Sequence, residues 1–430
     1  MISVTANNVS IQGFIVKRSG TSPYDCAIFV DRSSSMDVRY NTITSNNDGI
    51  SFFSSSNNVV SENTISSNNY DGIRLFSSDN NVVSENSIFS NGYNGISVYY
   101  SGNNVVSCNT ITDNYYGIGL FSTSNNVVYG NTIANNYYGM YLTLYSSNNV
   151  VYFNNFNNTY QAQSDSANIW DDGDEGNYWS DYDGVDLHKG LHQNETGSDG
   201  IGDVPYEKMD KSNIDHYPLM GIFSVFSVTL DREMYHVTVI CNLSISDFIF
   251  EVGPETGNKI VHFNVQDEDN KGGFCRIVIP NRLMSYPYIV LVGAEEIVPT
   301  LLDISNETYV YLYFTYVDSN QTVAIISSKM LHLYNELLNK HIKLQIDLYN
   351  LNATYYALLN NYSILLGNYS QLQESYRQLN DSYQEHLSDY SETTQNIRNL
   401  MQIFAATTAI FLITMIYLSK RAHASKTIIR

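Results

Sequence analysis

The residues of this chain that could do chemistry are a few carboxylates in a stretch that is otherwise almost uncharged. Residues 41–160 contain one basic side chain, Arg74, and six acidic ones: Asp48, Glu62, Asp71, Asp79, Glu85 and Asp113. Paired carboxylates act as acid and base in glycoside hydrolysis. Glu62 and Glu85 lie at equivalent points of a repeat, but Cys108 stands at the next such point. We therefore interpret both glutamates as solvent-facing, name no catalytic residue and predict that the chain is not an enzyme.

The stretch that holds these residues is a sequence repeat with a period of 22 to 23 residues. Three markers keep the same step: an Asn-Asn-Val-Val motif, an asparagine two residues before Ile or Phe, and a glycine. The motif begins at Asn57, Asn80, Asn103, Asn125 and Asn148. The glycines are Gly49, Gly72, Gly95, Gly117 and Gly139. Three markers locked to one short period predict a solenoid.

Each repeat has the pattern of three short strands. After each glycine the apolar residues alternate, as at Ile50 and Phe52, which marks a strand with one buried face. Asn, Ser and Gly fill the corners, where turn geometry is needed. Three strands per coil predict a right-handed parallel β-helix over residues 1–160, stacked at about 4.8 Å per coil. Residues 1–40 contain degenerate coils without an evident cap or signal peptide, so we expect residues to be missing upstream.

Stacking of identical residues in such a coil has two consequences. One asparagine per coil should form a structural ladder of amide hydrogen bonds: Asn63, Asn86, Asn109, Asn131 and Asn154. One tyrosine per coil, two residues before each glycine, should form an aromatic column: Tyr70, Tyr93, Tyr115 and Tyr137. The column is either ring stacking that covers a coil corner or a strip that binds sugar rings.

The repeat resembles the β-helix of NosD-like proteins of the archaeal cell-surface type. The likeness extends to Ile-Trp-Asp-Asp-Gly at 169–173, Gly-Asn-Tyr-Trp-Ser-Asp-Tyr at 176–182 and Asp-Gly-Ile-Gly-Asp-Val-Pro-Tyr at 199–206. These motifs are similar to the segment that closes such helices in archaeal surface proteins. The resemblance covers roughly residues 1–220 and implies the carbohydrate-binding and sugar-hydrolase β-helix class. The class is functionally mixed, so the likeness specifies the fold and no single activity.

Charge and cysteine content exclude several functions. The net charge of -21 argues against nucleic-acid binding. Four cysteines without a CxxC motif give neither a disulfide framework nor a zinc signature, although Cys241 and Cys275 are placed to pair or to remain buried thiols. His188 and His192 are spaced for metal binding, but no Cys or Met accompanies them.

Residues 161–220 are acidic and rich in aromatic residues, with 14 carboxylates and three lysines. We expect them to cap the β-helix. Their Asp-Gly pairs are either solvated turns or an oxygen-rich calcium site, without the final glutamate of an EF-hand. The calcium candidates are Asp181, Asp183, Asp186, Asp199 and Asp203.

Three further segments complete the chain. Residues 221–328 have eight short apolar runs separated by turns, which predicts an immunoglobulin-like β-sandwich. Residues 329–400 carry leucine every seventh position from Leu337 to Leu379 beside a seam rich in tyrosine, which predicts a coiled-coil stalk and a homo-oligomer. Residues 401–418 are uncharged and predict one transmembrane helix, followed by a basic cytoplasmic tail at 419–430.

Asn-x-Ser/Thr sequons support an extracellular location for the bulk of the chain. The glycosylation candidates are Asn157, Asn194, Asn242, Asn306, Asn320, Asn352, Asn361, Asn368 and Asn380. We predict a mostly β, single-pass surface glycoprotein anchored in the cell membrane, with a structural or adhesive role and a glycan or envelope component as its partner. Two alternatives stay open: a polysaccharide lyase or glycosidase of the β-helix class, and an exported metal-handling accessory protein of the NosD type.

Overall fold

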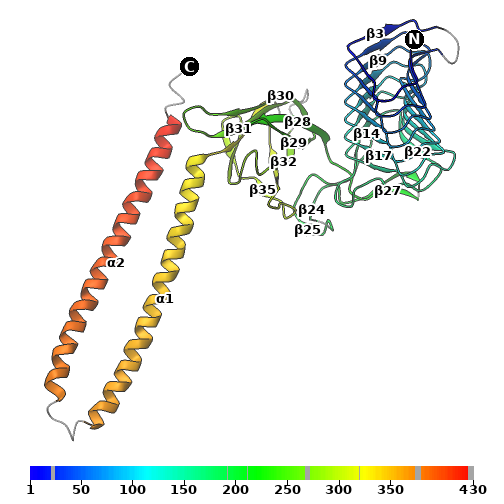
Figure 1. The fold of residues 1–430 in the computed structure, drawn as a ribbon. Helices are drawn as coiled ribbons and strands as arrows, with labels where there is room; N and C mark the ends of the chain where they lie inside the picture. The colour runs from blue at the N-terminus through cyan, green and yellow to red at the C-terminus, as the bar shows by residue number, and fades with distance from the viewer. Residues whose placement is uncertain are drawn as a thin grey trace. The chain divides into compact units, whose positions relative to one another are not determined.

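The computed structural model of the chain describes residues 1–20, 25–190, 192–210, 212–266, 272–318, 320–372 and 379–424. It divides into two compact units. The first, Met1–Val252 with Lys259–Ile326, contains a solenoid and two antiparallel sheets. The second, Gly253–Asn258 with Ser327–Arg430, contains two long helices (Figure 1).

The solenoid is a parallel β-helix, as predicted. It has about eight coils, since two of its three parallel sheets have eight strands. Sheet A is built from β1 (Ile2–Val4), β4 (Cys26–Asp31), β7 (Asp48–Phe53), β10 (Ile73–Phe76), β13 (Asn94–Tyr99), β16 (Tyr116–Phe121), β19 (Tyr138–Thr143) and β22 (Tyr160–Ser164). Sheet B is built from β2 (Ser10–Gln12), β5 (Asp37–Arg39), β8 (Val59–Ser61), β11 (Val82–Ser84), β14 (Val105–Ser107), β17 (Val127–Tyr129) and β20 (Val150–Tyr152). Sheet C is built from β3 (Ile15–Lys17), β6 (Thr42–Thr44), β9 (Thr64–Ser66), β12 (Ser87–Phe89), β15 (Thr110–Thr112), β18 (Thr132–Ala134), β21 (Asn155–Asn157) and β23 (Tyr178–Trp179).

One continuous apolar core runs through the coils. The alternating residues after each glycine point inward and are fully buried, as at Ile50, Phe52 and Ile96. Trp170 and Trp179 extend this core into the cap. The predicted alternation is therefore confirmed.

The coils turn at three corners, and each corner uses the same two-residue device. A residue in the left-handed backbone region is followed by a buried asparagine, as at Glu62 (φ 55°) and Asn63 or Asn57 (φ 60°) and Asn58. The buried amide of Asn109 donates to the carbonyls of Val83 and Ser107 and to Oδ1 of Asn131. Repeated over the coils, this arrangement makes the ladder Asn63, Asn86, Asn109, Asn131 and Asn154. Two parallel ladders, which the sequence analysis did not recognise, include Asn68–Asn91–Asn114 and Asn81–Asn104–Asn126.

The glycine column is required by close approach between coils. A Cβ atom built on Gly95 would lie 2.7 Å from the carbonyl oxygen of Gly117 and 2.5 Å from the Ile111 side chain. Since real Cβ contacts are essentially never this short, Gly95 cannot be replaced by a larger residue without a shift of the neighbouring coil.

The cap, residues 161–220, is ordered around a buried carboxylate. Asp215 accepts hydrogen bonds from the Trp179 indole (2.8 Å) and from the backbone N–H groups of Asn177 (2.7 Å) and Tyr217 (3.1 Å). Tyr206 stacks on Trp179 with ring centroids 4.3 Å apart. Two short hairpins complete the cap, β24 (His188–Lys189) with β25 (Glu195–Thr196) and β26 (Tyr206–Asp210) with β27 (Asn213–Asp215).

Two five-stranded antiparallel sheets follow, and every predicted run of this region coincides with a strand. One sheet contains β28 (Ile222–Leu230), β29 (Glu233–Cys241), β32 (Gly273–Pro280), β36 (Tyr309–Tyr316) and β35 (Thr300–Leu301). The other contains β30 (Ser244–Val252), β31 (Lys259–Gln266), β37 (Gln321–Ser327), β33 (Tyr288–Val292) and β34 (Glu295–Ile297). They share one apolar core, while their immunoglobulin-like topology stays a prediction. Cys241 and Cys275 face each other across β29 and β32 as free thiols with their Sγ atoms 3.4 Å apart.

Contacts of three kinds join the β-helix and its cap to these sheets. Asn155 Nδ2 donates to the Phe223 carbonyl (2.7 Å), and the Phe223 N–H donates to Asn155 Oδ1 (2.8 Å). The Phe153 and Phe223 rings stack with centroids 4.7 Å apart. The buried Arg276 guanidinium lies 2.5 Å from the Glu175 carboxylate.

The second unit differs from the predicted stalk. Helices α1 (Lys329–Leu372) and α2 (Leu379–Ala424) cover the predicted helical span, and Figure 1 shows them side by side. The Tyr355 ring stacks on Tyr390 with centroids 6.4 Å apart, and Tyr362 stacks on Tyr383 at 6.2 Å. In one unbroken helix the first pair would be about 50 Å apart, at 1.5 Å per residue. The tyrosine seam, which the sequence analysis placed in a homo-oligomeric coiled coil, therefore pairs α1 with α2 of the same chain.

One stretch of α2 fits the predicted membrane span. His386–Met415 is long and apolar enough to cross a bilayer by length and composition, and none of it is buried. The predicted span at 401–418 overlaps this stretch, and residues 425–430 of the predicted tail lie outside the described residues.

The asparagine ladder predicts a large loss of stability in Asn109→Ala. The substitution removes the acceptor of both the Asn86 side-chain amide and the Asn86 backbone N–H. It also removes a donor to the buried carbonyls of Val83 and Ser107, and each buried group left unsatisfied costs about 1–3 kcal/mol. We expect the unfolding free energy to fall by about 3–5 kcal/mol, measured by chemical denaturation. Thr110→Ala, at a neighbouring exposed position, should change it by less than about 1 kcal/mol. Equal effects of the two substitutions would contradict a structural role for the ladder.

The cap predicts higher stability in mild acid. Burial raises the pKa of Asp215 to about 7, against the opposing effect of its N–H donors from Asn177 and Trp179. The folded state thus holds this proton more tightly than the unfolded chain, so the unfolding free energy falls as pH rises from about 4 to about 7, by about 4 kcal/mol at most. We expect a lower melting temperature at pH 8 than at pH 5. Asp215→Asn should reduce this difference, and a parent protein that is more stable at pH 8 would contradict it.

Candidate functional site: the outer face of sheet A

An exposed strip of tyrosines runs along sheet A. The predicted column supplies Tyr93, Tyr115 and Tyr137, whose rings stack at centroid distances of 6.0 and 5.0 Å. Each ring of this column is about 42–43% exposed. Tyr70, the first predicted member, is also exposed. The column therefore lies on the surface, and centroid distances of this size indicate offset stacking that leaves part of each ring face open.

A second tyrosine column, which the sequence analysis missed, lies beside the first. Tyr116, Tyr138 and Tyr160 occupy the position just before the glycine or its equivalent, and they pair in register along β16, β19 and β22. Tyr116 meets the Tyr115 ring edge-on at 4.7 Å, and Tyr141 joins the strip 4.8 Å from Tyr116. We define the tyrosine strip as Tyr93, Tyr115, Tyr116, Tyr137, Tyr138, Tyr141 and Tyr160. The signal for the second column was the Tyr-Tyr-Gly sequence at two successive coils.

The second column changes from tyrosine to acid toward the N-terminal coils. Tyr116 pairs with Asn94, and the equivalent residues of the two preceding coils are Asp71 and Asp48. Asp71 accepts hydrogen bonds from Asn94 Nδ2 and Ser97 Oγ, each at 2.7 Å. Asp48 accepts one from the Asp71 N–H at 3.1 Å. The cluster is therefore cross-linked between three coils.

Arg74 covers this acidic cluster. One of its terminal nitrogens lies 3.9 Å from an Asp48 carboxylate oxygen, and its guanidinium lies over the rings of Phe76 (5.6 Å) and Tyr99 (5.4 Å). Burial raises the pKa of Asp48 to about 6, assisted by the negative charge of Asp71, while Arg74 acts in the opposite direction. Burial also raises the pKa of Asp71.

Asp48 and Asp71 are a carboxylate pair that was not singled out from the sequence, where only Glu62 and Glu85 were compared. The structure brings the two aspartates together with Arg74, the basic residue of the repeats. The signal was available, since each aspartate directly precedes a repeat glycine. Glu62 and Glu85 are exposed corner residues, as interpreted. Asp48 and Asp71 are both buried and hydrogen-bonded, which keeps a bulky substrate away from them.

The five calcium candidates of the cap have separate partners. Asp186 accepts from the N–H groups of Asp199 and Gly200, and Asp203 accepts from Leu187 and His188. Asp199 accepts from Gly190, Asp181 from the Tyr206 hydroxyl, and Asp183 lies 3.7 Å from the Lys208 ammonium. Within the described residues no three His, Cys, Asp or Glu side chains are grouped to hold a metal ion. Calcium binding stays a prediction.

The glycosylation candidates that can be placed are exposed. These are Asn157, Asn194, Asn242, Asn306, Asn320, Asn352 and Asn361. The side chains of Asn368 and Asn380 lie outside the described part of the chain.

Comparison with known proteins agrees with the fold of this site. Residues 3–184 match the family model described as periplasmic copper-binding protein (NosD). No curated protein matches the chain. Among solved structures, a mutant of the periplasmic alginate epimerase AlgG is 24% identical over 33% of this chain, with a TM-score of 0.31. The match spans about a third (35%) of the epimerase's own length.

Two further solved structures are similar at lower identity. The Dettilon tailspike protein is 16% identical, with 74% of this chain and 72% of the tailspike covered and a TM-score of 0.34. An alginate lyase from Paenibacillus sp. str. FPU-7 is 13% identical, with 41% of this chain and 87% of the lyase covered and a TM-score of 0.24. At these identities the likeness concerns the fold alone. The coil geometry and the repeat show a parallel β-helix, and residues 3–184 of the chain are similar to the NosD family model.

Proposed function

We propose that this chain is a membrane-anchored surface protein whose β-helix binds glycans along the tyrosine strip. The observation that carries the proposal is the strip itself, two adjoining tyrosine columns on one face of sheet A. Contiguous exposed aromatic surfaces on soluble proteins are common interaction sites. Partly open ring faces accept the C–H groups of sugar rings, and phenolic hydroxyls donate and accept hydrogen bonds with sugar hydroxyls.

The charge around the strip favours an uncharged glycan. All seven members of the strip are tyrosines, and the nearest charged cluster on sheet A holds two carboxylates and one arginine. Because Arg74 is the single cation of this cluster and lies 3.9 Å from an Asp48 oxygen, a polyanionic chain gains little Coulomb attraction along sheet A. Neutral polysaccharides, which bind by stacking and hydrogen bonding, fit this surface best.

Anchoring by α2 is the second part of the proposal. Lys420 and Arg421 follow the apolar stretch at once, and the positive-inside rule then puts the C-terminus in the cytoplasm and the β-helix outside. The exposed sequons agree with an extracellular location. Ring contacts in the helix pair place the span beside the start of α1, which carries Glu336 and Lys340. Entry into lipid therefore requires the span to leave α1, because these charges are costly in hydrocarbon.

Self-association of the helices is also part of the proposal. The tyrosine seam is used within the chain, while the leucine column at Leu344, Leu351, Leu358 and Leu365 is 44–60% exposed. An apolar residue at every seventh position suits a second copy of the same helix pair. A homo-oligomer would therefore bury this column.

The two alternative functions have less support. A polysaccharide-processing enzyme would need its acid and base to reach a substrate, and the Asp48–Asp71 pair is buried. A metal-handling role rests on the family description alone, since the described residues hold no metal-binding group of three or more ligands.

Substitutions in the strip test the glycan proposal. Tyr115→Ala and Tyr138→Ala each remove one ring from the centre of the strip. We expect each to weaken binding of a neutral polysaccharide found on a glycan array by roughly 2- to 12-fold, since one aromatic contact contributes about 0.5–1.5 kcal/mol. The matched control is Tyr286→Ala, an exposed tyrosine outside the strip, which should bind normally. Unchanged binding in both strip variants, with the fold intact, would rule out the strip as the site.

Membrane fractionation tests the anchor. The full chain should be recovered with membranes and released by detergent but not by high salt or alkali, because an apolar helix is held by hydrocarbon. A chain ending at residue 400 should be soluble. Recovery of the full chain in the soluble fraction would disprove the anchor and leave the glycan proposal standing.

A further inference from the structure

A second candidate site lies in the first compact unit, where the cap meets the antiparallel sheets. Here a cavity of about 340 Å³ is open to solvent. Its lining comes from the cap, from Arg276 on β32 and from the loop after β35: Asp174, Lys189, Gly190, Asp199, Ile201, Arg276, Leu302, Asp303 and Ile304. The volume falls in the range of small-molecule sites, about 300–1,000 Å³.

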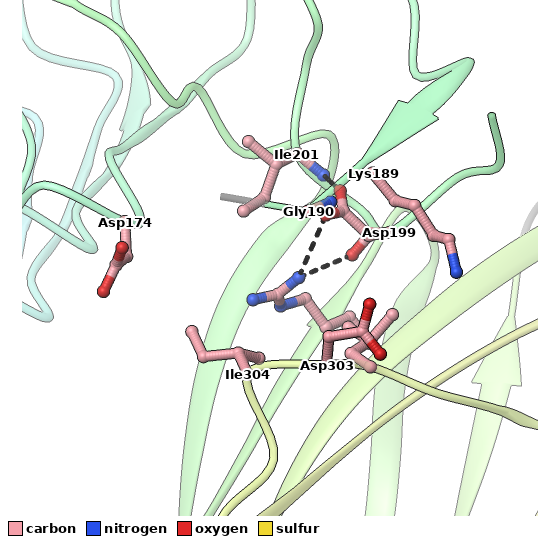
Figure 2. A pocket seen from close by; sticks show the side chains of 9 residues that line it. Asp174, Lys189, Gly190, Asp199, Ile201, Asp303 and Ile304 are labelled. Carbon is pink, nitrogen blue, oxygen red and sulfur yellow. Dashed lines mark hydrogen bonds and ion pairs between the residues drawn. The ribbon is translucent and has the colours of Figure 1, made fainter. Parts of the chain in front are cut away.

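The floor of the cavity is fixed by Arg276. Its side chain is 2% exposed, its guanidinium lies 2.5 Å from Glu175, and it donates to the Asp199 carbonyl at 2.9 Å. Figure 2 shows the contacts with Asp199. The Nε–H of Arg276 is buried and has no acceptor among the described residues. Because buried donors are nearly always paired, this N–H is a vacant position for an oxygen acceptor.

The rim carries both signs of charge in unpaired form. Lys189 supplies an ammonium group, while Asp174 and Asp303 are exposed carboxylates. None of the three takes part in an ion pair between described residues. Figure 2 shows Asp174 and Lys189 at opposite ends of the cavity, with Asp303 between them.

The remaining wall is apolar. Ile201, Leu302 and Ile304 line it, and Figure 2 shows Ile304 between Asp174 and Asp303. A ligand that fills the cavity must therefore bring an aliphatic body as well as charge. A bare metal ion does not match this lining, and the described residues hold no three grouped metal ligands.

We propose that this cavity binds a small zwitterion with an aliphatic body, namely a free α-amino acid such as leucine. The ligand carboxylate would meet Lys189 and the Arg276 Nε–H. Its ammonium group would meet Asp303 or Asp174, and its side chain would lie against Ile201 and Ile304. A zwitterion pairs with rim charges of both signs, whereas an amine alone leaves Lys189 without a ligand partner and an acid alone leaves the rim carboxylates without one.

Calorimetric titration of the full chain in detergent tests this assignment. The three probes are leucine, isoamylamine, which lacks the carboxylate, and 4-methylpentanoate, which lacks the ammonium group. We expect one leucine to bind per chain and each single-charge analogue to bind at least about tenfold more weakly, the effect of losing one charge-assisted contact. No heat with leucine at millimolar concentration, or equal binding of either analogue, would overturn the proposal.

Substitutions at the exposed rim test the site without disturbing the fold. Arg276 is unsuitable, because its removal leaves the buried Glu175 without its partner. Lys189→Gln and Asp303→Asn should each weaken leucine binding about tenfold or more without shifting the melting temperature. Lys340→Gln and Asp318→Asn, at exposed positions that are not part of the cavity lining, are the matched controls. Parent-like binding in both rim variants would place leucine elsewhere and overturn the assignment. Glycan binding by the tyrosine strip is measured separately and does not depend on this result.

Discussion

The interaction on which the rest of the structure depends is the hydrogen-bonded stacking of buried asparagines between coils. Each coil turns at a residue in the left-handed region, and the next residue buries an amide that satisfies backbone carbonyls at the bend. Without such a side chain, each corner would leave polar backbone groups unpaired in the core, at a cost of about 1–3 kcal/mol each. The same amide bonds to its equivalent in the next coil, so corner geometry and coil register are fixed together.

Fixed register gives the outer face its chemistry. Because equivalent residues lie directly above one another, a tyrosine that recurs in the sequence becomes a continuous column on the surface. The same rule gathers Asp48 and Asp71, which are 23 residues apart, into one hydrogen-bonded cluster. Sheet A therefore presents aromatic rings over its C-terminal coils and a buried acidic group, covered by Arg74, over its N-terminal coils. The same strand register produces the tyrosine columns and the Asp48–Asp71 cluster. The tyrosines reach solvent, whereas the two aspartates are buried.

The stacking of equivalent residues also explains which features could be predicted from the sequence. The period, the glycine column and the first asparagine column are visible in the sequence because each marker recurs in at least five successive coils. The second tyrosine column was missed because it begins only at Tyr116. The equivalent positions of the two preceding coils hold Asn94 and Asp71. Asp215 at the centre of the cap, and Arg276 beside Glu175, depend on contacts between residues 36 to 101 positions apart that follow no repeat. The helix pair was missed for another reason, since a heptad pattern does not specify whether its partner is another chain or the same one.

The junction of the cap and the antiparallel sheets has a cavity and a buried ion pair, which arise from residues outside the repeats. A β-helix offers only shallow columns, because each coil copies the last. Arg276 and Glu175 form a buried ion pair there, and the desolvation of such a pair makes it a poor source of net stability. A pair of this kind does fix the orientation of the two parts it joins, because separating the charges without water is costly. The cavity beside it therefore has a preset shape, and preorganisation of this kind reduces the entropy lost when a small ligand binds.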